Sequence, residues 1–511
     1  MPLPDGTATV EAPSHHPHQP HIHVEDKGLK SNAIGFVSSV VIGVASTAPG
    51  YSLAASLGFI AAVVGIGLQS PAILLIAFIP MAMIAAAYYY LNRADPDCGT
   101  TFSWVGKALG PWAGWIGGWA IIVADIIVMA NLAQIAGKYT FLLFDWDSAA
   151  NSTAAVTALG VLWIVLMTAI CYIGIELSAR TQVVLLSFEI VTLALFAIVA
   201  LVKVAAGDAA ATSVDPSVSW LNPFAVGSFS ALTSGVLIAI FIYWGWDSAV
   251  TVNEETEGSN KTPGKAAVVS TVLLLLIYVI VAVAAQAYIG TDALVKNQDD
   301  VLSFLGTQVF GSPLDKILVI AVLTSAAAST QTTILPTART TLSMARAGAL
   351  PRSLGTVSPR YMTPTVSTLL MGLFSVLWYV GLTIVSENIL FDSISALGLM
   401  IAFYYGLTGY ACVVYYRHQL LRNLKTFVLV GVLPLLGALI LTGVFIKSCV
   451  DLSDPANSAS GDSWFGIGPP LIIGIGFLIF GAILMVIWYL TGHRAFFRRK
   501  TETAHADALT A

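Results

Sequence analysis

The sequence predicts an all-α integral membrane protein with about 12 transmembrane helices, arranged as a 5+5 inverted repeat in which helices 1 and 6 are broken. Of the 511 residues, 57% are hydrophobic and 10% are charged, which is far from the composition of a soluble protein. About twelve apolar runs are long enough to cross the hydrocarbon layer, which takes ~20 helical residues. Two runs are interrupted by glycine, proline and polar residues. Broken helices at matching places in two halves are typical of transporters.

The membrane domain is expected to cover residues 33–490. The first repeat covers about 33–203, the second about 229–414, and two extra helices follow at about 426–490. A repeat of five spans places the next repeat in the opposite orientation. The spans are expected at 33–64, 69–92, 112–143, 153–174, 178–203, 229–253, 266–289, 313–342, 364–385, 390–414, 426–447 and 468–490.

Residues 1–32 and 491–511 read as polar tails, and the first is expected to be disordered. If the spans alternate, most of the 23 lysine and arginine residues fall on the side of the two tails. Cytoplasmic loops carry such an excess of basic residues. The sequence therefore predicts a multi-pass protein of the cell membrane with both termini in the cytoplasm.

The histidine and cysteine residues form no metal-binding pattern. Five histidines lie in the proline-spaced tract at residues 15–23, and the other three lie in loops or in the second tail. The four cysteines show no paired spacing. We expect no metal site, and without a histidine cluster in a span a membrane enzyme is disfavoured. No basic patch with interleaved aromatic residues indicates nucleic acid. The role of the histidine-rich tail stays open.

The first break lies in the run GVASTAPG, from Gly43 to Gly50. Glycine relaxes the backbone, Pro49 removes a hydrogen-bond donor, and nearby hydroxyls can bond the freed backbone groups. The amino end of a half-helix is a ready site for a carboxylate. The alternative is a proline kink satisfied by neighbouring helices. The candidate substrate-binding residues here are Ser46, Thr47, Ala48 and Gly50.

The second break lies in the run YWGWDSA, within the sixth span. A glycine hinge between large amphipathic rings suits a pocket that encloses a small solute, and released carbonyl groups there would accept an ammonium. The alternative is an aromatic belt at the membrane interface. The candidate substrate-binding residues here are Tyr243, Trp244, Gly245, Trp246 and Asp247.

Three carboxylates are expected inside the membrane, at Asp125, Glu189 and Asp247. Ionisable groups there are costly and usually serve a purpose, so these suit proton carriage or contact with a cationic substrate. The alternatives are a hydrogen bond to a neighbouring serine or tyrosine for Asp125 and Glu189, and a helix cap for Asp247. The eighth span adds Ser325 and Ser329, which could coordinate sodium or bond back to their own helix.

Three stretches carry a family resemblance. They are MARAGALPRSLGTVSPRYMTPTVS at 344–367, YWGWDSAVTVNEETEGSNKTPGKAA at 243–267 and DPDCGTTFSWVGKALGP at 95–111. From Ala33 to about Leu490 the chain resembles the amino acid, polyamine and organocation (APC) transporter superfamily. Within that superfamily it resembles the bacterial amino acid permeases. In some proton-coupled members a lysine occupies the middle of span five, where this chain has Glu189.

The resemblance implies a permease that imports an amino acid, and we expect proton symport with Glu189 as the proton carrier. The substrate carboxylate would lie at the amino end of the second half of span one and the ammonium near span six, with Trp246 or Tyr243 closing the site. Asp125, Ser325 and Ser329 are further ion-coupling candidates. No cofactor is expected beyond the coupling ion, a proton or sodium.

Two alternatives stay open. One is a carrier or exchanger of polyamines or cationic amino acids, since the buried charge is acidic. The other is a membrane channel or solute sensor, although the sequence shows neither pore-like rings of charge nor a signalling domain. The expected partners are a small amino acid or organic amine and the lipid bilayer. The substrate, the direction of flux and the oligomeric state are left open.

Overall fold

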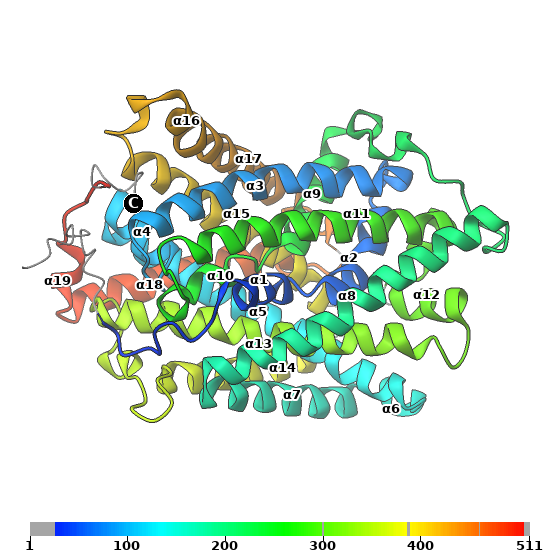
Figure 1. Cartoon of the computed structure of the whole chain (residues 1–511), viewed down its shortest axis with the longest axis horizontal. Helices are drawn as coiled ribbons and strands as arrows, with labels where there is room; N and C mark the ends of the chain where they lie inside the picture. The colour runs from blue at the N-terminus through cyan, green and yellow to red at the C-terminus, as the bar shows by residue number, and fades with distance from the viewer. Residues whose placement is uncertain (1–25, 299–300, 386–388, 459, 505–511) are drawn as a thin grey trace, which may run out of the picture.

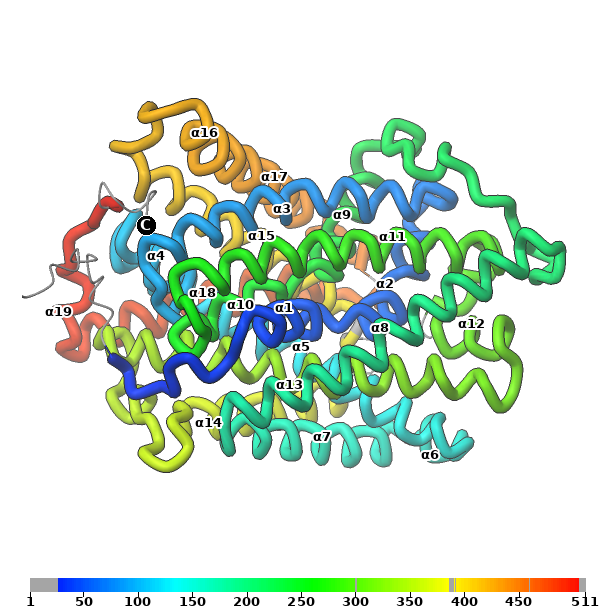
Figure 2. The backbone as a smooth tube through the Cα atoms, in the orientation of Figure 1, coloured from blue at the N-terminus to red at the C-terminus, as the bar shows by residue number. Residues whose placement is uncertain are grey.

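The computed structural model describes residues 26–298, 301–385, 389–458 and 460–504. The histidine-rich tract at 15–23 lies outside these residues. The long helices run side by side along the long axis of the molecule (Figure 1), and both described ends of the chain lie at the same end of it (Figure 2). We call this end, which carries residues 26–35 and 491–504, the terminal face.

Within the described chain, 12 helical spans are long and apolar enough to cross a membrane, which confirms the expected fold class. Their ends fall within about one helical turn of the expected positions, except at the end of α11. The spans are α1 (Phe36–Ser46) with α2 (Pro49–Ala62), α3 (Ser70–Ala94), α5 (Pro111–Leu143), α7 (Thr153–Ile173), α8 (Ile175–Ala206), α9 (Phe229–Tyr243) with α10 (Ser248–Thr251), α11 (Thr262–Lys296), α13 (Lys316–Arg346), α14 (Thr365–Val385), α15 (Ile389–Tyr415), α16 (Leu424–Thr426) continuing through a π-helical segment into α17 (Leu433–Asp451), and α18 (Pro469–Leu490).

Several shorter helices were not expected from the sequence. They are α4 (Thr101–Leu109), α6 (Asp147–Ala150), α12 (Val301–Phe310) and α19 (Arg494–Phe497). Helix α4 replaces an expected loop because its short amphipathic run buries Phe102, Trp104 and Val105 against the bundle. The range of α11 consists of two helical stretches joined across a kink, because Gly290, at φ 72° and ψ 168°, has a non-helical backbone. The first stretch therefore ends beside the expected end at residue 289, and a short second stretch continues to Lys296.

The broken span one and helix α13 lie in the interior of the bundle, while α18 lies at its periphery. Most residues of the first span and of α13 are buried, whereas α18 exposes apolar side chains along much of its length. Helix α13 packs against α5 and α8 and also touches both α1 and α2. A mostly buried helix beside a broken one places polar side chains of α13 next to the interrupted backbone.

Candidate functional site

The first break falls where the sequence predicted it. Helix α1 ends at Ser46, and Ala48 adopts the left-handed conformation at φ 47° and ψ 67° before α2 begins at Pro49. The hydroxyl of Ser52 donates to the carbonyl oxygen of Thr47 at 2.6 Å. Because hydroxyls satisfy part of the freed backbone, the interruption is stable in the bundle interior.

The amino end of α2 is capped by side chains from two other spans. The N–H group of Gly50 donates to Oε1 of Glu189 at 2.7 Å, and the N–H group of Tyr51 donates to Oγ of Ser325 at 3.1 Å. The Ser325 hydroxyl donates to the same Glu189 oxygen at 2.9 Å. The other oxygen of Glu189, Oε2, is buried and has no hydrogen-bond partner among the described residues. One oxygen is therefore anchored and the other is available to a proton or a cation.

Helix α13 also holds the other half of the break. The hydroxyl of Ser329, one helical turn after Ser325, donates to the carbonyl oxygen of Ser46 at 3.0 Å. The structure thus brings together three of the four candidate ion-coupling residues around the first break.

Asp125, the fourth candidate, lies elsewhere. Its carboxylate accepts a hydrogen bond from the Thr337 hydroxyl, between α5 and α13. The alternative expected for Asp125 was a serine or tyrosine partner, and the structure supplies a threonine hydroxyl instead. The structure shows no contact between Asp125 and Glu189, and a coupling role for Asp125 stays a prediction.

The second break lies against the first. Helix α9 ends at Tyr243, and Gly245 has φ 117°, a conformation that side chains with a Cβ rarely adopt. A Cβ atom at Gly245 would lie 2.7 Å from the backbone of Ser46. The hydroxyl oxygens of Ser46 and Ser248 are 2.8 Å apart. The two broken segments are therefore in direct contact through backbone and hydroxyl groups.

Asp247 is held by two neighbouring tyrosines of α15. The Tyr405 hydroxyl donates to Oδ1 at 2.9 Å, and the Tyr404 hydroxyl donates to Oδ2 at 3.2 Å. The indole N–H of Trp244 donates to the Tyr404 hydroxyl oxygen. Asp247 is thus a buried carboxylate oriented by a network of hydroxyls, with no basic residue in ion-pair contact among the described residues.

Aromatic side chains surround the two breaks. Trp246 packs against Tyr88 and Tyr405, with ring centroids 5.0 and 5.2 Å away, and Tyr243 packs against Tyr278 at 5.2 Å. Three buried polar atoms here have no partner among the described residues, namely the indole N–H of Trp246 and the hydroxyls of Tyr51 and Tyr243. Buried polar groups are normally paired, so these three suit contact with a solute.

Tyr278 of α11 joins the two breaks and was not singled out from the sequence. Its hydroxyl donates to the carbonyl oxygen of Ile242 at 2.6 Å and lies 3.5 Å from that of Thr47. Tyr404, Tyr405 and Ser248 were also missed. The available signal was that a hydroxyl inside an apolar span needs a partner, and the carbonyl groups and Asp247 of the breaks supply one.

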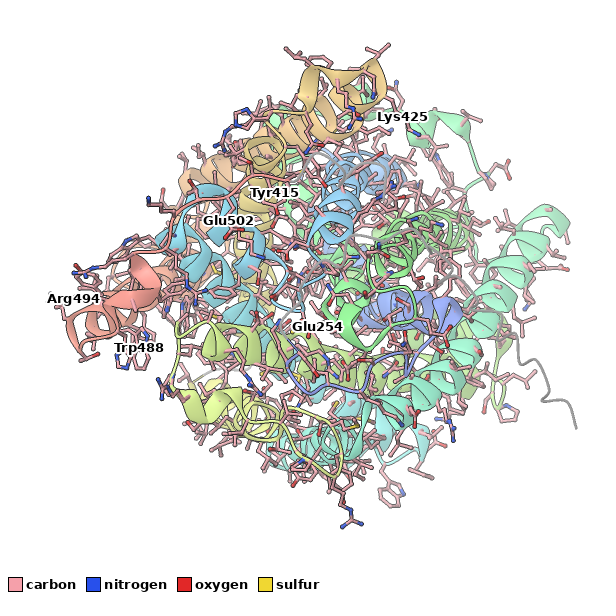
Figure 3. All side chains as sticks on the ribbon, turned by 60° about the vertical axis from the view of Figure 1, so that its left-hand side comes forward. Glu254, Tyr415, Lys425, Trp488, Arg494 and Glu502 are labelled. Atoms are coloured by element: carbon pink, nitrogen blue, oxygen red, sulfur yellow. The ribbon has the colours of Figure 1, made fainter. Side chains whose placement is uncertain are left out.

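A cluster of charged groups closes the terminal face beyond the second break. Lys27 Nζ lies 2.6 Å from Glu254 and 2.9 Å from Asp97, and 3.6 Å from the Cys98 sulfur. We call these four residues the Lys27 latch. Glu254 lies near the middle of this face in Figure 3. The ligand atoms of Asp97, Cys98 and Glu254 have a spacing that could suit a metal ion, but the Lys27 ammonium lies among them.

Burial and neighbouring charges shift the pKa values of all four side chains of the Lys27 latch. Burial alone would lower the pKa of Lys27, but Cys98, Asp97 and Glu254 outweigh burial and raise it well above its usual value. Burial would raise the pKa of Asp97, but the nearby Lys27 and Lys107 lower it below its usual value. Burial raises the pKa of Glu254 despite the adjacent ammonium, and burial also raises that of the Cys98 thiol.

A buried ion pair lies directly behind the Lys27 latch. Arg339 of α13 makes a two-pronged contact with Glu255, at 2.5 Å from Nε and 2.8 Å from Nη2. Both side chains are almost completely buried. This pair fixes the loop after α10 to α13. Because Arg339 pairs with Glu255, it does not neutralise the carboxylates inside the membrane. Asp125, Glu189 and Asp247 have no ion-pair partner among the described residues.

Two broken spans that meet in the middle of the twelve membrane helices of the described chain define a membrane transporter of the inverted-repeat class. The fold resembles the crystal structure of MhsT in complex with L-phenylalanine, with a TM-score of 0.56 at 16% identity over 80% of this chain and 98% of that one. The model of the family described as "Amino acid permease" matches residues 32–478, and the chain belongs to this family.

Three relatives illustrate the range of the family. An uncharacterized transporter of Mycobacterium tuberculosis is 28% identical over 66% of this chain and 71% of its own length. The branched-chain amino acid permease BcaP of Lactococcus lactis is 23% identical over 56% and 63%. The low-affinity putrescine importer PlaP of Escherichia coli is 21% identical over 73% and 79%. The chain is thus a multi-pass member of a transporter family.

Proposed function

We propose that this protein imports an amino acid across the cell membrane by proton symport, with both termini in the cytoplasm. Family membership supports transport of a small solute, and the relative BcaP is named for amino acid transport. The observation that carries proton coupling is the contact between Glu189 and the amino end of α2. The excess of basic residues on the side of the tails supports the orientation.

The coupling follows from competition for one hydrogen-bond donor. A substrate carboxylate would bind best at the amino end of α2, where Glu189 already accepts from the Gly50 N–H group. Two ionised carboxylates repel each other at one helix end, and protonation of Glu189 removes that repulsion. Proton and substrate then favour each other's binding, as symport requires.

The substrate would lie between the two breaks, enclosed by aromatic side chains. Tyr51, Tyr243 and Trp246 supply unpartnered polar atoms, and Ser46 and Ser248 supply hydroxyls. Movement of α1 and α10 relative to α13 would open the site alternately to the two faces. Sodium is the other candidate coupling ion, held by oxygens of Ser325, Ser329 and Glu189.

The test is uptake of radiolabelled amino acids into proteoliposomes with an imposed proton gradient. Glu189→Gln keeps an acceptor oxygen for Gly50 but cannot take up a proton. We expect the variant to lose gradient-driven accumulation while still exchanging substrate across the membrane. Glu176→Gln, at an exposed position of the same helix, is the matched control and should behave as wild type. Gradient-driven accumulation by Glu189→Gln would contradict the proposed coupling, and uptake that needs only sodium would favour the sodium site.

A second candidate is import of a polyamine or cationic amino acid, favoured by Asp247. This carboxylate is oriented by Tyr404 and Tyr405 inside the second break, and the relative PlaP is named as a putrescine importer. For a cationic substrate, Asp247→Asn should raise KM by roughly tenfold or more through loss of a charge-assisted contact. If the substrate is a neutral amino acid, the same variant should change KM much less.

A further inference from the structure

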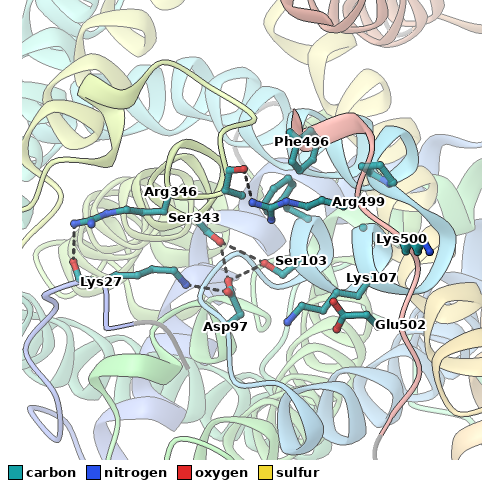
Figure 4. A pocket seen from close by; sticks show the side chains of 14 residues that line it. Lys27, Asp97, Ser103, Lys107, Ser343, Arg346, Phe496, Arg499, Lys500 and Glu502 are labelled. Carbon is teal, nitrogen blue, oxygen red and sulfur yellow. Dashed lines mark hydrogen bonds and ion pairs between the residues drawn. The ribbon is translucent and has the colours of Figure 1, made fainter. Parts of the chain in front are cut away.

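A cavity of about 140 Å³ opens at the terminal face, away from the two breaks. It lies between α4, the end of α13 and the C-terminal segment at 496–502 (Figure 4). Its lining includes the hydroxyls of Ser103 and Ser343 and five basic side chains, which are Lys27, Lys107, Arg346, Arg499 and Lys500. Basic residues from four separate parts of the chain thus meet at one small space.

Two of the five basic residues are already neutralised. Lys27 pairs with the acids of the Lys27 latch, and Lys107 Nζ lies 2.7 Å from Asp95. Glu502 lies beside Lys107 in Figure 4 and interacts with it electrostatically. The remaining positive charge therefore belongs to the other three residues.

Arg346, Arg499 and Lys500 have no carboxylate within ion-pair distance in the part of the chain that the structure describes. Arg346 Nη2 donates to the carbonyl oxygen of Lys27 at 3.3 Å, and Arg499 Nη2 donates to that of Ala347 at 2.8 Å. A guanidinium group has five N–H donors, so each arginine retains most of its donors. Two carboxylates, Asp97 and Glu502, also line the cavity, but they interact with Lys27 and Lys107. The three cations without an ion pair repel one another, and an anion bound among them would relieve this repulsion.

We propose that this cavity binds a phosphate-bearing anion, held by Arg346, Arg499 and Lys500. Guanidinium groups match the oxygens of a phosphate group in pairs, and lysine adds a compact point charge. The hydroxyls of Ser103 and Ser343 also line the cavity, but they donate to Asp97 Oδ1 at 2.8 and 2.7 Å, so the three basic side chains would hold the anion. The volume suits a single phosphate group with part of the molecule that carries it.

Binding there would fasten the C-terminal segment to the bundle. The backbone of the segment is already hydrogen-bonded to α4 and α15. The N–H group of Glu502 donates to the carbonyl oxygen of Lys107, and that of Ala504 donates to the carbonyl oxygen of Tyr415. A bound phosphate would join Arg499 and Lys500 to Arg346 of α13, which contacts the backbone of Lys27. The anion would thereby stabilise the segment and the Lys27 latch together.

Two sources can supply this chemistry, an anionic lipid headgroup or a soluble phosphate compound. Basic clusters directly after a transmembrane helix are typical of contacts with anionic lipids. Here α18 ends at Leu490 and is followed by Arg494, Arg498, Arg499 and Lys500. Aromatic contacts of Trp112 with Tyr489 and Phe497 flank this segment.

The test compares two double variants of the full-length protein with equal charge changes. Arg499→Gln with Lys500→Gln removes two cavity residues. Arg494→Gln with Arg498→Gln is the matched control, because neither residue lines the cavity and Arg494 lies at the edge of the terminal face in Figure 3. The shift in Tm is measured in detergent against inorganic phosphate, with chloride at equal ionic strength. It is measured again in nanodiscs of phosphatidylglycerol or phosphatidylcholine.

We expect phosphate or phosphatidylglycerol to raise the Tm of wild type and of the control. The cavity variant should need a roughly tenfold or higher phosphate concentration for the same shift, or lose the lipid-dependent shift. A response to phosphate identifies a soluble source as sufficient, and a response to phosphatidylglycerol alone identifies the lipid. The proposal would be overturned if both double variants lose the Tm shift equally, or if neither phosphate nor phosphatidylglycerol shifts the Tm of wild type. Monodisperse elution and unchanged Tm in chloride show that the variant folds.

Discussion

At the scale of single residues, Gly245 sets how closely the two breaks approach. Its φ of 117° and its contact with the backbone of Ser46 leave no space for a Cβ atom. Glycine allows two backbones to approach this closely because it carries no Cβ atom. The contact of the two breaks therefore depends on one residue whose role is purely geometric.

We expect Gly245→Ala to lower stability and to abolish uptake. The strained backbone alone costs roughly 1–3 kcal/mol, and the overlap with Ser46 pushes the breaks apart. The measurement is Tm together with uptake into proteoliposomes. Gly381→Ala, in α14 with open space around its Cβ position, is the control and should be neutral or slightly stabilising. Normal uptake by Gly245→Ala would show that the close approach is dispensable.

At the scale of elements, the breaks are held by the helices beside them. Ser325 and Ser329 of α13 bind both halves of span one, and Tyr278 of α11 reaches a carbonyl of each broken span. Freed backbone groups in a membrane need such partners, because hydrocarbon provides none. Helices α11 and α13 therefore form the frame against which the broken spans would move.

We expect Tyr278→Phe to destabilise the protein by about 1–3 kcal/mol, because the buried carbonyl of Ile242 loses its donor. The turnover rate should fall more than the affinity, since Tyr278 contacts backbone on both moving spans. Thermal unfolding and uptake kinetics provide the two readouts. Tyr172→Phe, whose ring packs on Tyr361 near the terminal face, should change neither one. A pure loss of affinity in Tyr278→Phe would place its hydroxyl on the substrate instead.

The membrane spans and their breaks were more predictable from the sequence than the side-chain contacts between the spans. Apolar length identifies a span, and glycine, proline and hydroxyl residues within it identify a break, so both breaks were located from sequence. Helical periodicity specifies the face of a residue but not which span lies opposite at the same depth. For this reason the sequence indicates Glu189 and Ser325 as separate candidates. It does not predict that they contact each other and together cap the start of α2. Tyr278, Tyr404 and Tyr405 were missed because tyrosine in an apolar span is also a common packing residue.

At the scale of the whole molecule, the Lys27 latch ties the start of the described chain to the loops after α3 and α10. Movement of span six would have to separate Glu254 from Lys27. The pKa of Lys27 is raised, so its stabilising contribution is present below the usual lysine pKa and lost only above it. The pKa of Asp97 is lowered, so its contribution is present above the usual aspartate pKa and lost only below it.

The losses from Lys27 and Asp97 therefore lie outside the range between about pH 4 and pH 10. Among the ionised groups of the Lys27 latch, Glu254 is the one whose pKa is shifted toward this range, because burial raises it. We therefore expect Lys27→Gln to leave the midpoint of the uptake–pH profile unchanged, while Glu189→Gln alters the profile. The measurement is the initial uptake rate across this range. A Lys27→Gln profile that moves by a full pH unit would assign the pH dependence to the Lys27 latch.

Cys98 offers a built-in reporter of the same contact. It is buried beneath Lys27, and burial raises the pKa of its thiol, so it should react slowly with maleimide in this conformation. With the other three cysteines replaced by alanine, Lys27→Gln should speed the labelling by roughly tenfold. Lys30→Gln removes an exposed ion pair with Glu176 and is the control. Equal labelling rates in the two variants would show that Lys27 does not close this face.

The internal cap on α2 has a consequence for the return of the unloaded carrier. Because Glu189 and Ser325 already satisfy the Gly50 and Tyr51 N–H groups, departure of a solute leaves no exposed donors at that helix end. In the proposed transport cycle, the return step of the unloaded carrier then carries no large penalty there, which favours net transport over obligatory one-for-one exchange. Uptake into liposomes that contain no substrate inside should therefore proceed nearly as fast as uptake into preloaded ones.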